Sequence, residues 1–164
     1  MAVLFDYFVA PSDSDAAATI DRIGGPGTAV PARPGLFGRR SNVGQAAYRT
    51  VSAGIDPVVQ AGTLEEILTG RAYDELESDP KWGKSLAIRN EGEQLVLTVT
   101  DTLIAALADA SDDRLAEVAI PWSQTEEFWG AGDPLILAKL LRDLAELARA
   151  ARDDRQFVYC WVCV

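Results

Sequence analysis

The sequence predicts an α+β fold: a small mixed sheet that includes the N- and C-terminal strands and packs against a cluster of helices from the C-terminal half. Residues 135–152 carry a charged side chain at every third or fourth position, and the positions between them form an apolar face too wide for a surface helix. Residues 157–164 are apolar at successive positions, which is typical of a strand buried on both faces. We therefore expect this helix and the strand that follows it to form the centre of the core.

The length and composition predict a single domain over residues 1–164. A chain of 164 residues, 48% hydrophobic and 24% charged, is long enough to bury a substantial core. Residues 24–54 hold seven of the thirteen glycines, and no acidic residue occurs between Asp21 and Asp56. That interval contains the arginines Arg22, Arg33, Arg39, Arg40 and Arg49. We therefore expect a basic, Gly/Pro-rich loop on an acidic body, and loops of this length are usually functional or disordered.

Capping residues predict where two of the helices begin. Asp133 is a good N-cap for the helix before the last strand, and Pro134 suits its first position. Thr63 and Glu66 have the spacing of a capping box, which predicts a helix that ends at Gly70. The other expected elements are a strand at 2–9, a helix from Ser12 or Ser14 to Ile23, an irregular segment at 73–80, strands at 85–89 and 94–99, and helices at 101–110 and from Ser111 to a kink or restart at Pro121.

Three stretches of the chain share their order and short motifs with a known family. They are the first strand and helix, Gly54-Ile55-Asp56 leading to Ile67-Leu68-Thr69-Gly70, and the run from Leu95-Val96-Leu97-Thr98 through three helices to a terminal strand. In this order they resemble the YfbM-like family of uncharacterised bacterial proteins, and the resemblance implies the same fold. That family usually carries a Trp and a His in the helix of the second stretch. This chain has no His, so no site on those positions is carried over.

Charge and composition exclude several classes of function. A net charge of −10 and a pI near 4.4 argue against nucleic acid as a partner, since phosphate binding needs a cationic surface. The N-terminus lacks the basic residues of a signal peptide, and no apolar run approaches the ~20 residues that a membrane span needs. We therefore expect a cytoplasmic protein without a membrane segment.

The absence of histidine removes the commonest general base and metal ligand. We therefore expect no metal or other cofactor and assign no catalytic residue.

Cys160 and Cys163 match the C-x-x-C spacing of redox proteins, but on a strand they would point to opposite faces roughly 10 Å apart. We expect both thiols to be free and inert.

Two functional hypotheses follow. The first is a non-catalytic protein-interaction module, of the inhibitor or immunity-protein kind, because an acidic surface steers fast binding to a basic protein. The acidic body, the basic loop and the poverty of catalytic groups motivate this hypothesis. Arg39, Arg40 and Arg49 could also grip a phosphate or carboxylate. The alternative is an exposed loop whose arginines pair loosely with the acidic body.

The second hypothesis is a small-molecule site, for binding or catalysis, in an aromatic-lined groove. Such a groove would be lined by Tyr7, Tyr48, Trp122 and Trp129, with Arg49 or Glu126 as polar anchors. A carboxylate pair at Glu126 and Glu127 could do acid–base work, although neighbouring helical positions point about 100° apart. A solvated face over packed tryptophans is the alternative reading of that pair. The sequence does not rank a third possibility, a structural subunit of a homo-oligomer.

Overall fold

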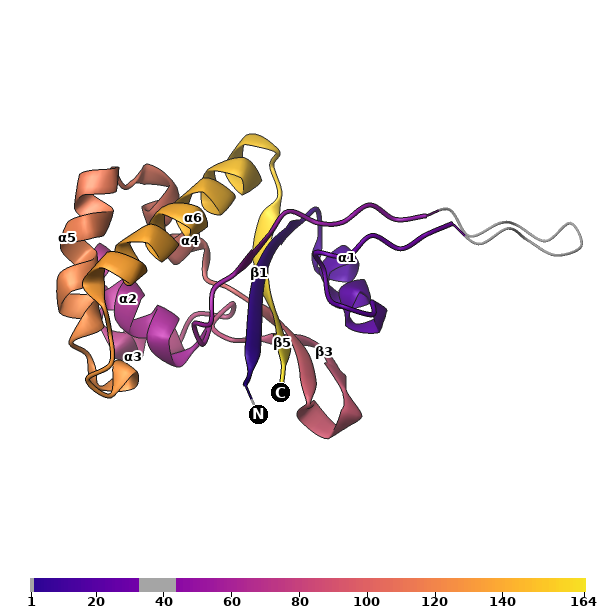
Figure 1. The fold of residues 1–164 in the computed structure, drawn as a ribbon, viewed down its shortest axis with the longest axis horizontal. Helices are drawn as coiled ribbons and strands as arrows, with labels where there is room; N and C mark the ends of the chain where they lie inside the picture. Colours follow the sequence, from indigo (N-terminus) through magenta and orange to yellow (C-terminus); the bar gives the residue numbers. More distant parts are fainter. Residues whose placement is uncertain (1, 33–43) are drawn as a thin grey trace, which may run out of the picture.

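The last strand of the chain lies at the centre of a five-stranded antiparallel sheet. The computed structural model describes residues 2–32 and 44–164, and the strand order is β2-β1-β5-β4-β3 (Figure 1). The strands are β1 (Leu4–Ala10), β2 (Thr50–Ser52), β3 (Ser85–Arg89), β4 (Gln94–Thr98) and β5 (Phe157–Cys163). The predicted α+β class, with the two terminal strands in the sheet, is confirmed. The sheet is antiparallel throughout and not mixed, and the short connection between β3 and β4 permits no other direction for that pair.

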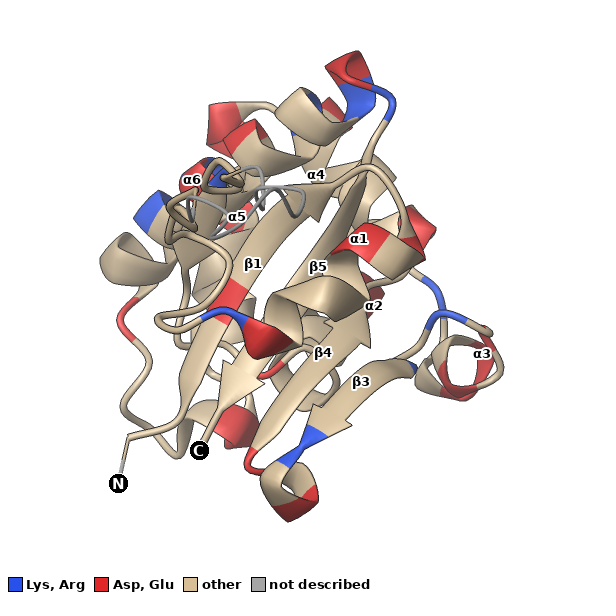
Figure 2. Cartoon of the chain, turned by 90° about the vertical axis from the view of Figure 1, so that its right-hand side faces the viewer, with Lys and Arg blue, Asp and Glu red and all other residues tan. Residues whose placement is uncertain are grey.

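Helices cover the two faces of the sheet unequally. The larger cluster lies on one face, and the short α1 and η1 lie on the other (Figure 1). Figure 2 views the sheet from this second side, with α1 in front of the strands. The helices are α1 (Asp13–Ala17), α2 (Val59–Thr69), α3 (Tyr73–Glu77), α4 (Asp101–Asp109), α5 (Asp112–Ser123) and α6 (Pro134–Asp153), and the 3-10 turns are η1 (Ala18–Asp21), η2 (Asn90–Gly92) and η3 (Glu126–Phe128).

The helix α6 and the strand β5 lie at the centre of the core, as predicted. The apolar face of α6 buries Leu137, Leu141, Leu144 and Leu147 among others, while β5 is buried on both of its faces. The side of the sheet under α6 forms the larger hydrophobic cluster. A smaller cluster lies on the α1 side and contains Phe8, Ala10, Ala16, Val96, Tyr159 and Trp161. Burial on both faces explains why β5 has no alternating pattern.

Several helix boundaries differ from the prediction. α2 begins before Thr63, whose hydroxyl donates to the carbonyls of Val59 and Gln60 within the helix and caps nothing. The Asp56 carboxylate instead accepts the amides of Val58 and Val59 at 2.8 and 2.7 Å. The predicted capping box is therefore wrong, although the predicted end at Gly70 is confirmed.

The remaining differences are local. The segment predicted to be irregular after residue 72 contains the short helix α3. Pro121 lies inside α5, which continues to Ser123 without a restart. Pro121 lacks the N–H that would donate to the carbonyl four residues earlier, and the helix ends within one turn after it. Ser12, Ser111 and Asp133 cap their helices as expected.

Both cysteines are free, as predicted for residues three apart on one strand. Cys160 lies on the α6 side of β5 and is fully buried, whereas Cys163 is partly exposed near the end of the strand. Burial raises the pKa of the Cys160 thiol well above its usual value, with smaller contributions from Asp56 and Asp6. A thiol that stays protonated in an apolar site is a poor nucleophile.

Candidate functional site

The residues predicted to contact a ligand or a partner lie in three different environments. Tyr48 and Arg49 line one cavity. Trp122 is fully buried, where its indole donates to the carbonyl of Gln60 at 3.0 Å. Glu126 and Trp129 are exposed on the connection between α5 and α6. Arg39 and Arg40 lie outside the described residues.

The predicted aromatic groove does not form. Tyr7 is buried under the helices and donates its hydroxyl proton to the carbonyl of Ile55 at 3.1 Å. Trp122 packs edge-on against Phe128, with ring centroids 5.2 Å apart. Of the four predicted wall residues, only Tyr48 reaches a cavity of ligand size. The sequence could not place these aromatics together or apart, because their separation depends on tertiary packing.

We define the Tyr48 cavity as the hollow of about 520 Å³ that is bordered by the end of β1, the start of α1, residues 45–49 and the C-terminal end of α6. Its wall at 45–49 is anchored by the paired amides and carbonyls of Val30 and Gln45, at 2.8 and 2.9 Å. The Tyr48 amide also donates to the carbonyl of Pro26 at 2.9 Å. Its charged lining residues are Arg22, Arg49, Asp15 and Asp154.

Arg22 is the buried cation of this cavity, with only 8% of its surface exposed. One guanidinium nitrogen donates to the carbonyls of Thr28 and Ala46 at 3.2 and 3.0 Å, and the other donates to the side chain of Gln45 at 2.9 Å. The guanidinium lies 4.5 Å from the centre of the Tyr48 ring. Within the described part of the chain, no carboxylate lies within 4 Å of it. The sequence grouped Arg22 with the loop arginines and gave no indication that it is buried.

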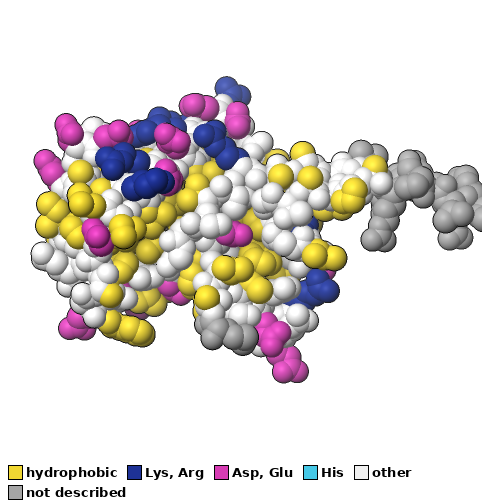
Figure 3. All heavy atoms as spheres, in the orientation of Figure 1, with side chains coloured by type: hydrophobic (Ala, Val, Ile, Leu, Met, Phe, Trp, Pro, Cys, Tyr) yellow, Lys and Arg dark blue, Asp and Glu magenta, His cyan; other side chains and the backbone are white. Residues whose placement is uncertain are grey.

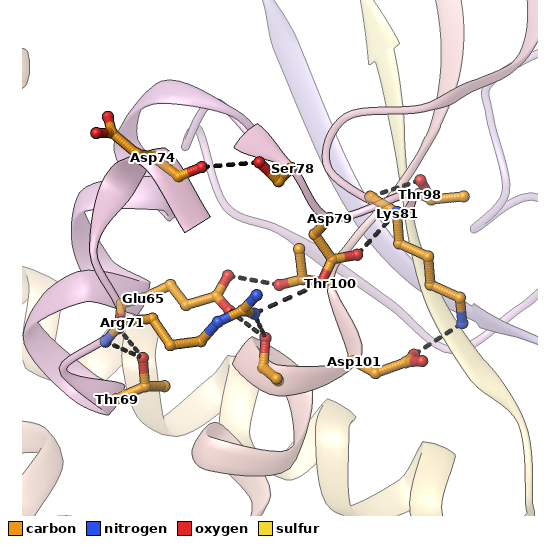
Figure 4. Close-up of polar contacts among 11 residues, drawn as sticks. Glu65, Thr69, Arg71, Asp74, Ser78, Asp79, Lys81, Thr98, Thr100 and Asp101 are labelled. Carbon is orange, nitrogen blue, oxygen red and sulfur yellow. Dashed lines mark hydrogen bonds and ion pairs between the residues drawn. The ribbon is translucent and has the colours of Figure 1, made fainter. Parts of the chain in front are cut away.

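A second polar cluster surrounds Glu65 of α2, which is 1% exposed (Figure 4). Its carboxylate accepts the hydroxyl protons of Thr100, at 2.5 Å, and of Thr102, and forms an ion pair with Arg71 at 3.1 Å. Arg71 also contacts Asp79 at 3.5 Å. Because both carboxylate oxygens are hydrogen-bonded and enclosed, this cluster ties α2 to the start of α4 and offers no open reactive group.

A smaller cavity of about 210 Å³ lies beside this cluster, between α4, the end of α6 and the start of β5. Its walls are mainly apolar, and Lys81 stands at its edge. The Lys81 ammonium pairs with Asp101 at 2.8 Å and lies 4.8 Å from the centre of the Phe157 ring. Tyr159 donates its hydroxyl proton to Asp13 at 2.8 Å. Burial raises the pKa of Tyr159, and the Asp13 carboxylate raises it further. Lys81, Asp101, Tyr159 and Asp13 of this cavity are therefore paired with one another.

The connection between α5 and α6 and the first turn of α6 expose apolar side chains beside acids. Trp129 is 93% exposed, Leu135 80% and Ile136 67%. Figure 3 shows exposed apolar side chains among charged ones over the helical part of the molecule. We define the Trp129 surface as these three residues together with the exposed Glu126 and Asp133.

Comparisons of the chain with models of protein families, with curated proteins and with solved structures gave no match. Within the described residues, no group of three or more Cys, Asp or Glu side chains is arranged to hold a metal ion. The described helices include none that is long and apolar enough to cross a membrane.

Proposed function

We propose that this protein is a non-catalytic interaction module that binds a basic protein partner through the Trp129 surface. The observation that carries the proposal is the near-complete exposure of Trp129 on the connection between α5 and α6. Tryptophan, with tyrosine and arginine, is enriched among the residues that dominate the binding energy of protein interfaces. A cytoplasmic location, an inhibitor or immunity-like role and the resemblance to the YfbM-like family are parts of this proposal.

The backbone holds Trp129 outward at a conformational cost. Trp129 has φ +50°, in the left-handed region that bulky residues rarely adopt, and Gly130 follows with φ +76°. On the far side of the turn, the next residues are tightly packed, because a Cβ on Gly132 would lie 2.3 Å from the carbonyl oxygen of Ser123. The end of α5 and the approach to α6 are thus in direct backbone contact. A strained, tightly packed turn that exposes an indole supports a binding role.

The charge around the indole selects the partner. No Lys or Arg occurs between Arg114 and Lys139, while this interval contains Glu117, Glu126, Glu127 and Asp133. An apolar centre bordered by carboxylates complements a basic segment that carries its own apolar side chain. The net charge of −10 would add long-range attraction to such a partner.

Trp129→Ala tests the proposal. The wild-type protein is immobilised on a resin and incubated at low salt with an extract of the source cells. It should retain a basic protein in stoichiometric amount, which mass spectrometry identifies. Trp129→Ala should weaken that complex by at least about 30-fold, as loss of a central interface residue does. Glu126→Lys should also weaken it, and 1 M salt should dissociate it, because the Debye length falls to about 3 Å.

Ile23→Ala is the control, because Ile23 is an apolar residue as exposed as Trp129, at 94%, on the other side of the sheet. It should leave the complex intact. Retention of the same partner by Trp129→Ala, an acidic partner, or the absence of any stoichiometric partner would each refute the proposal.

A further inference from the structure

We propose that the Tyr48 cavity binds a small zwitterion of the amino-acid class, with its carboxylate on Arg22 and its ammonium group between Asp15 and Asp154. This site is separate from the Trp129 surface. The cavity borders α6 at Ala150 and the surface includes Ile136, so the two lie roughly 20 Å apart along the helix at ~1.5 Å per residue.

The first argument is the unbalanced charge of Arg22. A cation that is more than nine-tenths buried is normally paired with a carboxylate, because desolvation is costly. The hydrogen bonds that Arg22 makes all go to neutral oxygens, from Thr28, Ala46 and Gln45. These bonds satisfy part of its donor capacity, and no carboxylate of the described residues lies within 4 Å of the guanidinium. The carboxylate of a ligand would supply the missing charge through the fork geometry of the guanidinium.

The second argument is the rigidity of the cation. Residues 28 and 46, on either side of the undescribed segment, both accept from the same Arg22 nitrogen. Its guanidinium lies against the Tyr48 ring, which in turn packs on Phe8 with ring centroids 5.7 Å apart. The side chain is therefore held before a ligand arrives. A fixed donor loses little conformational entropy on binding.

The third argument concerns the sign of the other charges. Asp15 and Asp154 line the same cavity as Arg22, and Arg49 lies exposed at its edge. The two arginines and the two aspartates balance, so the lining lacks the excess of positive charge that a multiply charged anion such as phosphate would need, while its carboxylates attract an ammonium group. A cavity that combines a buried cation with carboxylates at its edge therefore favours a molecule with both charges. Its volume of about 520 Å³ is within the usual ~300–1,000 Å³ range of small-molecule sites.

Calorimetry with the full-length protein tests this assignment. The common α-amino acids are titrated one by one, followed by the N-acetyl derivative of the best ligand, its decarboxylated amine and inorganic phosphate. At least one amino acid should bind. Removal of either its positive or its negative charge should weaken binding by about tenfold or more, equivalent to ~1.4 kcal/mol. Phosphate should bind more weakly than that amino acid.

Two aspartates at the end of α6 give a matched pair of variants. Asp154→Asn removes a carboxylate that lines the cavity and should weaken the amino acid about tenfold while leaving its N-acetyl derivative unchanged. Asp153→Asn removes the same charge one residue earlier, outside the cavity lining, and should leave both affinities unchanged. Arg22→Gln should abolish binding. If that variant fails to fold, the Asp154 and Asp153 pair decides the question.

The proposal is overturned if no amino acid binds, if the N-acetyl derivative or phosphate binds as tightly, or if the two aspartate variants behave alike. Trp129→Ala should leave the affinity unchanged. The result is therefore independent of whether the Trp129 surface binds a protein.

Discussion

Glu65 shows how a single buried charge can connect two elements of this fold. Its carboxylate is enclosed between α2 and α4, and Arg71 is the cation that compensates it. Removing one partner of a buried ion pair leaves the other charge desolvated, which costs much more than the pair itself contributes. The ion pair between Arg89 and Asp21, at 3.4 Å, is largely exposed and provides a direct comparison.

Arg71→Ala should therefore lower the free energy of unfolding by roughly 3 kcal/mol, because Glu65 loses its counter-charge. Arg89→Ala should lower it by less than ~1 kcal/mol, as is usual for exposed pairs. Urea unfolding followed by circular dichroism measures both values. Equal effects of the two substitutions would show that the charge of Arg71 does not stabilise the buried carboxylate of Glu65.

The sequence contained an unused indication of the Glu65 cluster. Ala61, Leu64, Glu65 and Leu68 have the spacing of one inward face of a helix, so a carboxylate at the third of these positions predicts a buried, paired charge. The partner could not be predicted, because Arg71 and the threonines at the start of α4 come from separate segments. Arg22 carried no comparable pattern. Its burial depends on the carbonyls of residues 28 and 46, which only the folded chain brings together.

At the scale of the elements, local chemistry predicted most helices and strands but not every helix start. Asp133 with Pro134, and Ser111, cap helices as expected, since each is followed by a clear helical pattern. Thr63 and Glu66 also match a local motif, yet the helix already runs through Thr63. The earlier start is set by Asp56, whose Oδ1 accepts two amides of the first turn. Strand order could not be predicted, because β5 pairs with β1 across the whole chain.

The two candidate caps of α2 predict opposite outcomes for two alanine substitutions. Asp56→Ala should destabilise the protein by about 1 kcal/mol, because the amides of Val58 and Val59 lose their acceptor. Thr63→Ala should change stability by less than ~0.5 kcal/mol, since the hydroxyl only donates to carbonyls within the helix and alanine is a better helix former. Thermal and urea unfolding measure both. A larger loss of stability for Thr63→Ala than for Asp56→Ala would support Thr63 as the cap of α2.

At the scale of the whole molecule, the two ends of α6 present different chemistry. The N-terminal end lies beside an acidic surface with exposed apolar side chains, and the C-terminal end borders a cavity with a buried cation. The same helix and β5 fill the centre between them. Both proposed sites therefore depend on the stability of this centre. The pH dependence of that stability concerns the entire fold.

The centre of the sheet should make the protein sensitive to alkali. Tyr7 of β1 lies opposite Cys160 of β5, and burial raises the pKa of both side chains well above their usual 10.0 and 9.0. In the unfolded chain these groups ionise at their usual values, while in the folded protein they remain protonated. Their contribution to stability is therefore complete below about pH 9 and is lost as the pH rises further, by up to ~1.4 kcal/mol per pH unit for each group.

Urea unfolding between pH 8 and 11 should show this fall in stability. Tyr7→Phe should be less stable at pH 8, since it lacks the hydrogen bond to Ile55, but should show a shallower slope at high pH. An unchanged slope in that variant would place the alkaline sensitivity elsewhere in the molecule.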